Sequence, residues 1–154
     1  MTLEAADRLA LGDLVARYAL HADRREIDAM AGLFARDAVL VLPGAPGELD
    51  SVRTFTGRAE IAATLGALHG VPVTFHALAG EVFDAGPEPG TATGEIACVA
   101  HHLSDREDGA ARDLVWHCRY TDAYRLDGGT WRFARREQRI DSIETRPVRR
   151  RRRG

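Results

Sequence analysis

The chain has 154 residues, of which 45% are hydrophobic and 29% charged, and its formal net charge is −2. A chain of this length forms one domain, which buries roughly two-thirds of the surface that its unfolded form exposes. It has no apolar run near the ~20 residues that a membrane span requires, and Met1 to Ala10 carry acids instead of an apolar signal-peptide core. We therefore expect a cytoplasmic protein with no membrane partner.

The basic residues are unusual, because all 21 of them are arginines. This excludes lysine nucleophiles and Schiff-base chemistry. Six of the arginines, Arg146 and Arg149 to Arg153, gather in RPVRRRRRG. Such a run binds nucleic acid in some proteins, but this one follows a proline and has no interleaved aromatic residues. We therefore predict one domain over residues 1–145, a disordered tail over 146–154, and no nucleic-acid partner.

The N-terminal segment predicts an amphipathic helix, a break at an aspartate and a second short helix. The apolar face of the first helix is formed by Leu11, Leu14, Val15, Tyr18 and Ala22. This spacing places Tyr18 on the core side and Asp23 where the apolar face ends. A buried carboxylate needs a hydrogen-bonding partner. A strand over Ala38–Leu42 then stops at the turn-forming residues PGAPGE.

The remainder of the chain predicts one more helix and several strands. Ser51–Phe55 is a short return strand, and Gly57–Leu68 has helical spacing of its apolar residues. The later strands are expected over Val73–Phe83, Thr91–Leu103, Asp113–Leu126 and Thr130–Ile143. This order predicts an α+β fold, a cone-shaped barrel in which helices pack on a strongly curved mixed or antiparallel sheet and enclose a pocket.

Side-chain alternation indicates which strand residues face the pocket. The more apolar faces of two neighbouring strands carry Ile96, Cys98, Trp116, Cys118 and Tyr120. Placing these residues inside brings His102 inward and leaves His101 outward. The two cysteines lack the spacing of metal ligands, and no two histidines have the i, i+4 spacing of a helical metal motif. We expect reduced thiols, no metal and no cofactor.

His76 lies in VTFHALA, an otherwise apolar strand, where an imidazole needs a partner. Asp23 is the best candidate for that partner. A carboxylate bonded to one ring nitrogen fixes the tautomer and leaves the other nitrogen free to take a proton from a substrate. A structural histidine, with Asp23 as a helix-end group, is an equally good reading of the residues alone.

Further candidates come from the first helix and the last strand. Tyr18 can stabilise an oxygen that develops negative charge, although a tyrosine on an apolar stripe is also typical of a core. Arg136 shares a predicted strand face with Arg132, Ala134 and Gln138 and can hold an oxyanion. In the competing register of this strand, the neighbouring Arg135 takes the place of Arg136. The predicted substrate-binding residues are Arg136, Tyr120, Cys118, Trp116 and Gln138.

These residues resemble the SnoaL-like branch of the nuclear transport factor 2-like (cystatin-like cone) superfamily. The likeness runs from RLALGDLVARYALHADRREIDAMAGLF to TDAYRLDGGTWRF and is nearest to scytalone dehydratase, bile acid dehydratase and lindane dehydrochlorinase. It implies that Asp23 pairs with His76, and that Tyr18, His102 and Arg136 occupy functional positions. Ala22 and Leu42 differ from tyrosines of scytalone dehydratase. The resemblance also implies a homo-oligomer, a trimer or a dimer.

We therefore expect a cofactor-independent acid–base enzyme, either a dehydratase-like lyase or an isomerase or polyketide cyclase. Its substrate is expected to be small, largely apolar, and to carry a hydroxyl or carbonyl group. In this hypothesis His76 abstracts a proton, Asp23 orients His76, and Tyr18 stabilises charge on oxygen, while His102 or Arg136 assists the leaving group. The alternative is a non-catalytic ligand-binding domain or the structural small subunit of a ring-hydroxylating dioxygenase.

Overall fold

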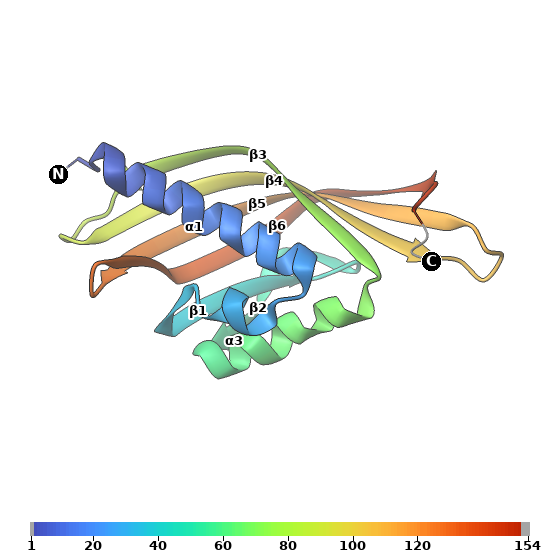
Figure 1. Ribbon diagram of the computed structural model, residues 1–154, viewed down its shortest axis with the longest axis horizontal. Helices are drawn as coiled ribbons and strands as arrows, with labels where there is room; N and C mark the ends of the chain where they lie inside the picture. Colours follow the sequence, from blue (N-terminus) through green and yellow to red (C-terminus); the bar gives the residue numbers. More distant parts are fainter. Residues whose placement is uncertain (1, 152–154) are drawn as a thin grey trace.

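The computed structural model describes residues 2–151 and shows an α+β fold (Figure 1). The helices are α1 (Ala5–Arg24), α2 (Ile27–Ala31) and α3 (Arg58–Leu65), and α3 continues into the 3-10 helix η1 (Gly66–Gly70). The strands are β1 (Phe34–Gly44), β2 (Glu48–Thr56), β3 (Val73–Ala85), β4 (Thr91–Asp105), β5 (Ala111–Asp127) and β6 (Thr130–Val148). No helix within residues 2–151 is both long and apolar enough to cross a membrane.

The six strands form one mixed sheet in the order β2-β1-β6-β5-β4-β3. Every neighbouring pair is antiparallel except β1 and β6, which run parallel with Leu40 opposite Arg136. Figure 1 shows α1 lying across the sheet, while α3 lies beside β1 and β2. The predicted arrangement of helices on a curved sheet is confirmed, and the space between the two layers holds the core.

The predicted apolar face of α1 forms the centre of that core. Leu11, Val15 and Ala22 have no exposed surface, and Tyr18 is buried with them. The helix continues past Asp23, so this carboxylate belongs to the last helical turn and not to a break. Arg25 ends the helix in the left-handed conformation, with φ 60°. A non-glycine residue there is uncommon and is stabilised by its side-chain bonds.

The last strand contains an irregularity that corrects one prediction. Its pairing with β5 passes directly from Arg135 to Phe133, which leaves Ala134 as an extra residue. A bulge of this kind shifts the alternation of side chains by one position. Arg136 and Gln138 are therefore buried on the same side as Phe133. The predicted shared face with Arg132 and Ala134 is wrong, and the competing register is excluded because Arg135 is exposed.

The C-terminal strand is longer than predicted. It continues past Ile143 to Val148, and so extends into the segment that we assigned to the tail. Beyond it, the guanidinium of Arg150 donates two hydrogen bonds of 2.8 Å to the carboxylate of Asp105. Residues 152–154 of the predicted disordered tail lie outside the described residues. The division of the chain at residue 145 stays a prediction.

Candidate active site

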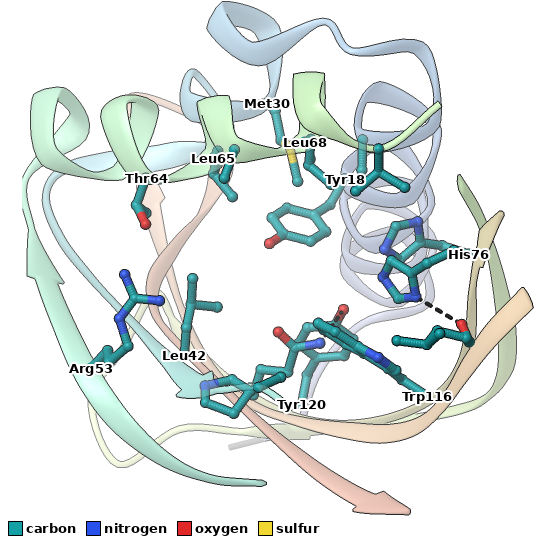
Figure 2. A pocket seen from close by; sticks show the side chains of 18 residues that line it. Tyr18, Met30, Leu42, Arg53, Thr64, Leu65, Leu68, His76, Trp116 and Tyr120 are labelled. Carbon is teal, nitrogen blue, oxygen red and sulfur yellow. Dashed lines mark hydrogen bonds between the residues drawn. The ribbon is translucent and has the colours of Figure 1, made fainter. Parts of the chain in front are cut away.

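A cavity of about 350 Å³ lies between the helices and the inner face of the sheet (Figure 2). Its walls are mostly aliphatic and aromatic. The residues that line it are Tyr18, Ala22, Met30, Leu42, Pro43, Ala45, Arg53, Thr64, Leu65, Ala67, Leu68, Val71, His76, His102, Leu114, Trp116, Tyr120 and Gln138. A mostly apolar cavity with a few converging polar groups is typical of a small-molecule site.

Asp23 and His76 form the predicted pair, since His76 Nδ1 lies 2.7 Å from Asp23 Oδ1. The carboxylate also accepts hydrogen bonds from the His76 backbone N–H at 3.1 Å and from the Thr74 hydroxyl at 3.0 Å. Burial raises the pKa of Asp23, but the hydrogen bonds from His76 and Thr74 outweigh this, and the pKa lies below its ordinary value. Asp23 is therefore an anion, which can only accept hydrogen bonds.

This pair fixes the state of the imidazole ring. Because Asp23 only accepts, Nδ1 of His76 carries a hydrogen, and in the neutral ring Nε2 has the free lone pair. Within residues 2–151, Nε2 has no hydrogen-bond partner. His76 lines the cavity, whereas Asp23 does not. The imidazole is thus at the wall, and the carboxylate that fixes its tautomer lies behind it.

Arg25 holds this pair in place from the outside, which the sequence analysis did not anticipate. Its guanidinium donates to the Thr74 hydroxyl at 2.7 Å, to the Val71 carbonyl at 2.6 Å and to the Ala22 carbonyl at 2.8 Å. These bonds join the end of α1 to the start of β3, the two elements that carry Asp23 and His76. Arg25 and Thr74 are therefore positioning residues for the pair.

His102 faces the cavity as alternation predicted, whereas His101 points away from it and pairs with Asp113 at 2.6 Å. His102 Nδ1 lies 3.0 Å from the Leu114 carbonyl oxygen and donates to it. Burial lowers the pKa of His102 below its ordinary value, only partly opposed by this hydrogen bond. His102 is therefore neutral near pH 7, and its Nε2 is a second acceptor, with the two imidazole centroids 6.3 Å apart.

Phenol and indole groups are among the hydrogen-bond donors of the residues that line the cavity. The Tyr18 hydroxyl points into it (Figure 2), and burial raises the pKa of Tyr18 to about 12 against the opposing charge of Arg136. The Tyr120 hydroxyl accepts a hydrogen bond of 3.3 Å from Gln138 Nε2. Trp116 Nε1 is buried and has no partner within residues 2–151. Tyr18 is consequently a protonated donor at neutral pH.

Two predicted substrate-binding residues lie behind the wall and do not line the cavity. Arg136 is fully buried, with its guanidinium carbon 4.2 Å from the Tyr18 ring centroid and 3.8 Å from that of Tyr120. Its Nε lies 3.1 Å from Asp122 Oδ1. The Cys118 thiol donates to the Cys98 carbonyl at 3.4 Å. Both residues therefore support the cavity from behind, since stacked aromatic rings and the neighbouring strand cover them.

Other lining residues escaped the sequence analysis. Arg53 and Thr64 lie on β2 and α3, and Met30 lies in α2. The residues of β2 lack a clear alternation of apolar and polar side chains, so no pattern showed which of them face inward. Among residues 2–151, no three histidine, cysteine or acidic side chains gather in a way that would hold a metal ion.

Comparison with known proteins agrees with this architecture. The family model described as SnoaL-like domain matches residues 3–137. A search of curated proteins finds no significant match. A structure from Novosphingobium aromaticivorans DSM 12444, provisionally assigned as a scytalone dehydratase, has a TM-score of 0.76 and 22% identity, covering 94% of this chain and 90% of the other.

Two further solved structures have the same fold. An NTF2-like protein with a cystatin-like fold, also from N. aromaticivorans, has a TM-score of 0.66 and 24% identity, covering 88% of this chain and 82% of the other. The hexachlorocyclohexane dehydrochlorinase LinA-type3 from Novosphingobium barchaimii LL02 has a TM-score of 0.72 and 17% identity, covering 93% of this chain and 90% of the other. At these identities the likeness shows the fold alone. The chain belongs to the SnoaL-like domain family and has its NTF2-like cone fold.

Proposed function

We propose that this protein is a cofactor-independent acid–base enzyme, a dehydratase-like lyase that removes water from a small, largely apolar hydroxy-carbonyl compound. The observation that carries this proposal is the 2.7 Å hydrogen bond between Asp23 and His76, with the histidine on the cavity wall and the carboxylate behind it. A base so oriented, next to neutral donors, is suited to removing a proton from carbon.

In the first step His76 Nε2 takes a proton from the carbon beside the substrate carbonyl. Asp23 stabilises the imidazolium that forms, because its pKa is low enough to keep it ionised. The electron pair of the broken C–H bond moves onto the carbonyl oxygen as an enolate. The Tyr18 hydroxyl, which points into the cavity, donates a hydrogen bond to this oxygen.

In the second step the enolate expels the hydroxyl group from the neighbouring carbon. His76 returns its proton to the departing oxygen, so the product is water and the imidazole is neutral again. His102, being neutral, accepts a hydrogen bond from the substrate hydroxyl and holds it near His76.

An isomerase or a cyclase would share the first step. An isomerase would then return the proton to a different atom of the substrate, and a cyclase would use the enolate to form a new bond within the substrate. Elimination is favoured because two structural neighbours are named for it, as a dehydratase and a dehydrochlorinase.

The alternative, a ligand-binding domain or an oxygenase small subunit without proton transfer, needs the cavity but not the hydrogen-bonded pair. It leaves unexplained why Asp23 is ionised behind an imidazole that faces the cavity. Constant co-purification with an iron–sulfur large subunit would favour this alternative over the enzyme.

The proposal is tested by screening β-hydroxy ketones for the ultraviolet absorbance of the enone product. With any compound that reacts, His76→Ala should lower turnover by about 100- to 10,000-fold. His69→Ala is the matched control, because His69 is exposed and does not line the cavity. Circular dichroism of both variants shows whether they fold. Unchanged turnover in a folded His76→Ala protein would contradict the assignment.

A further inference from the structure

Arg53 places a positive charge in a cavity that is otherwise without formal charge. It is the one arginine among the lining residues, and none of them is an aspartate or a glutamate. Figure 2 shows its guanidinium on the wall opposite His76. The cavity therefore has acid–base groups at one side and a cation at the other.

The charge of Arg53 has no counter-charge within residues 2–151. Its guanidinium makes no hydrogen bond or ion pair there, and the guanidinium carbon lies 5.3 Å from the centroid of the Phe55 ring. The Phe55 ring orients the guanidinium without using its donors.

Thr64 adds a second donor to the cavity wall. It lies on α3, lines the cavity, and its hydroxyl has no side-chain hydrogen bond within residues 2–151. Figure 2 shows this hydroxyl on the same wall as the guanidinium. A planar cationic fork and a hydroxyl together match the two oxygens of a carboxylate.

We propose that Arg53 and Thr64 form a subsite for a carboxylate that the substrate carries at the end opposite its reacting carbon. This inference rests on the proposed function, because His76 defines the reacting end. One cation in a cavity of about 350 Å³ balances one negative charge, which favours a carboxylate over a doubly charged phosphate. The apolar side chains of Leu42, Leu65 and Leu68 then cover the middle of the substrate. The substrate class is accordingly a hydroxy- or oxo-carboxylic acid with an apolar body.

The test compares two probes of equal shape, 2-naphthoate and its neutral analogue 2-naphthamide, by calorimetric titration. Arg53→Gln should weaken 2-naphthoate binding about 3- to 10-fold, the range for one partly exposed charged hydrogen bond, and leave 2-naphthamide unchanged. Thr64→Val should weaken 2-naphthoate binding by a smaller factor, and Arg53→Lys should retain most of it. Added salt should weaken only 2-naphthoate.

Arg36→Gln is the matched control, since Arg36 is an exposed arginine on β1 that does not line the cavity. Equal binding of 2-naphthoate to native and Arg53→Gln protein would overturn the carboxylate subsite, as would failure of the native protein to bind 2-naphthoate at millimolar concentration. The titration measures binding and not turnover. It therefore tests the carboxylate subsite even if His76 does not act as a base. Loss of turnover in His76→Ala with unchanged 2-naphthoate binding would show that the reacting end and the carboxylate subsite have separate roles.

Discussion

Thr74 donates its hydroxyl hydrogen to Oδ1 of Asp23, the same oxygen that His76 Nδ1 contacts. The direction of this bond follows because the ionised carboxylate of Asp23 can only accept, while Arg25 donates to the Thr74 oxygen. The single hydroxyl hydrogen must therefore point at Asp23. A continuous chain of hydrogen bonds thus runs from Arg25 through Thr74 and Asp23 to the imidazole.

Replacing Thr74 with valine should weaken this chain while keeping the shape of the side chain. The carboxylate of Asp23 would lose one of the hydrogen bonds that hold its pKa down, so its pKa should rise. Turnover should fall about fivefold, which corresponds to one hydrogen bond of about 1 kcal/mol. Thr74→Ser keeps the hydroxyl and should turn over as the native protein does. Native turnover in a folded Thr74→Val protein would rule out this positioning role.

The low pKa of Asp23 also predicts how stability depends on pH. A carboxyl group whose pKa is lower in the folded protein stabilises the fold above its unfolded pKa of about 3.9, and this stabilisation is lost as pH falls through the folded pKa. Urea unfolding from neutral to acidic pH should therefore show a declining difference in unfolding free energy between the native protein and Asp23→Asn. Asp141→Asn serves as the exposed comparison. A difference that stays constant down to the lowest pH would show that Asp23 does not contribute in this way.

The buried pair of Asp122 and Arg136 predicts a large loss of stability when one partner is neutralised. Burial raises the pKa of Asp122 and Arg136 opposes that rise, while Tyr124 donates a hydrogen bond of 2.7 Å to the other carboxylate oxygen. Asp122→Asn leaves the Arg136 charge buried without its counter-charge, which costs about 3–5 kcal/mol. The unfolding free energy from urea titration measures this loss.

The double variant Asp122→Leu with Arg136→Met removes both charges and should be less destabilised than Asp122→Asn. For comparison, Asp141→Asn removes an exposed partner of Arg119 and should change the free energy of unfolding by less than about 1 kcal/mol. If Asp122→Asn unfolds at the same urea concentration as the native protein, the buried charge of Arg136 is balanced in another way.

Regular patterns made much of the fold predictable from the sequence. The apolar face of α1 and the alternation along β4 and β5 correctly placed Tyr18 and His102 inside, and the need of His76 for a partner led to Asp23. The extra residue Ala134 was not predictable, because a bulge depends on pairing with a neighbouring strand and not on the residue itself.

Arg25 and Arg53 show why part of the site could not be predicted. Helices that end in the left-handed conformation usually do so at glycine or asparagine, so an arginine at that position carries no sequence signal. Arg53 lies on a strand whose exposed face is as polar as its inner face. The role of Arg25 follows from its hydrogen bonds to Val71 and Thr74, which are distant in the chain, and the role proposed for Arg53 follows from its place on the cavity wall.

The parallel pairing of β1 with β6 determines the order in which the cavity can be assembled. Within the sheet, β1 and β2 join the other strands only through β6, which follows them in the chain. Through the sheet, Arg53 on β2 is therefore fixed relative to His76 on β3 only after Thr130–Val148 has been synthesised and the loop between Phe34 and Phe133 has closed. A nascent chain that lacks β6 can already contain Asp23 and His76, but it cannot yet enclose a substrate between them and Arg53.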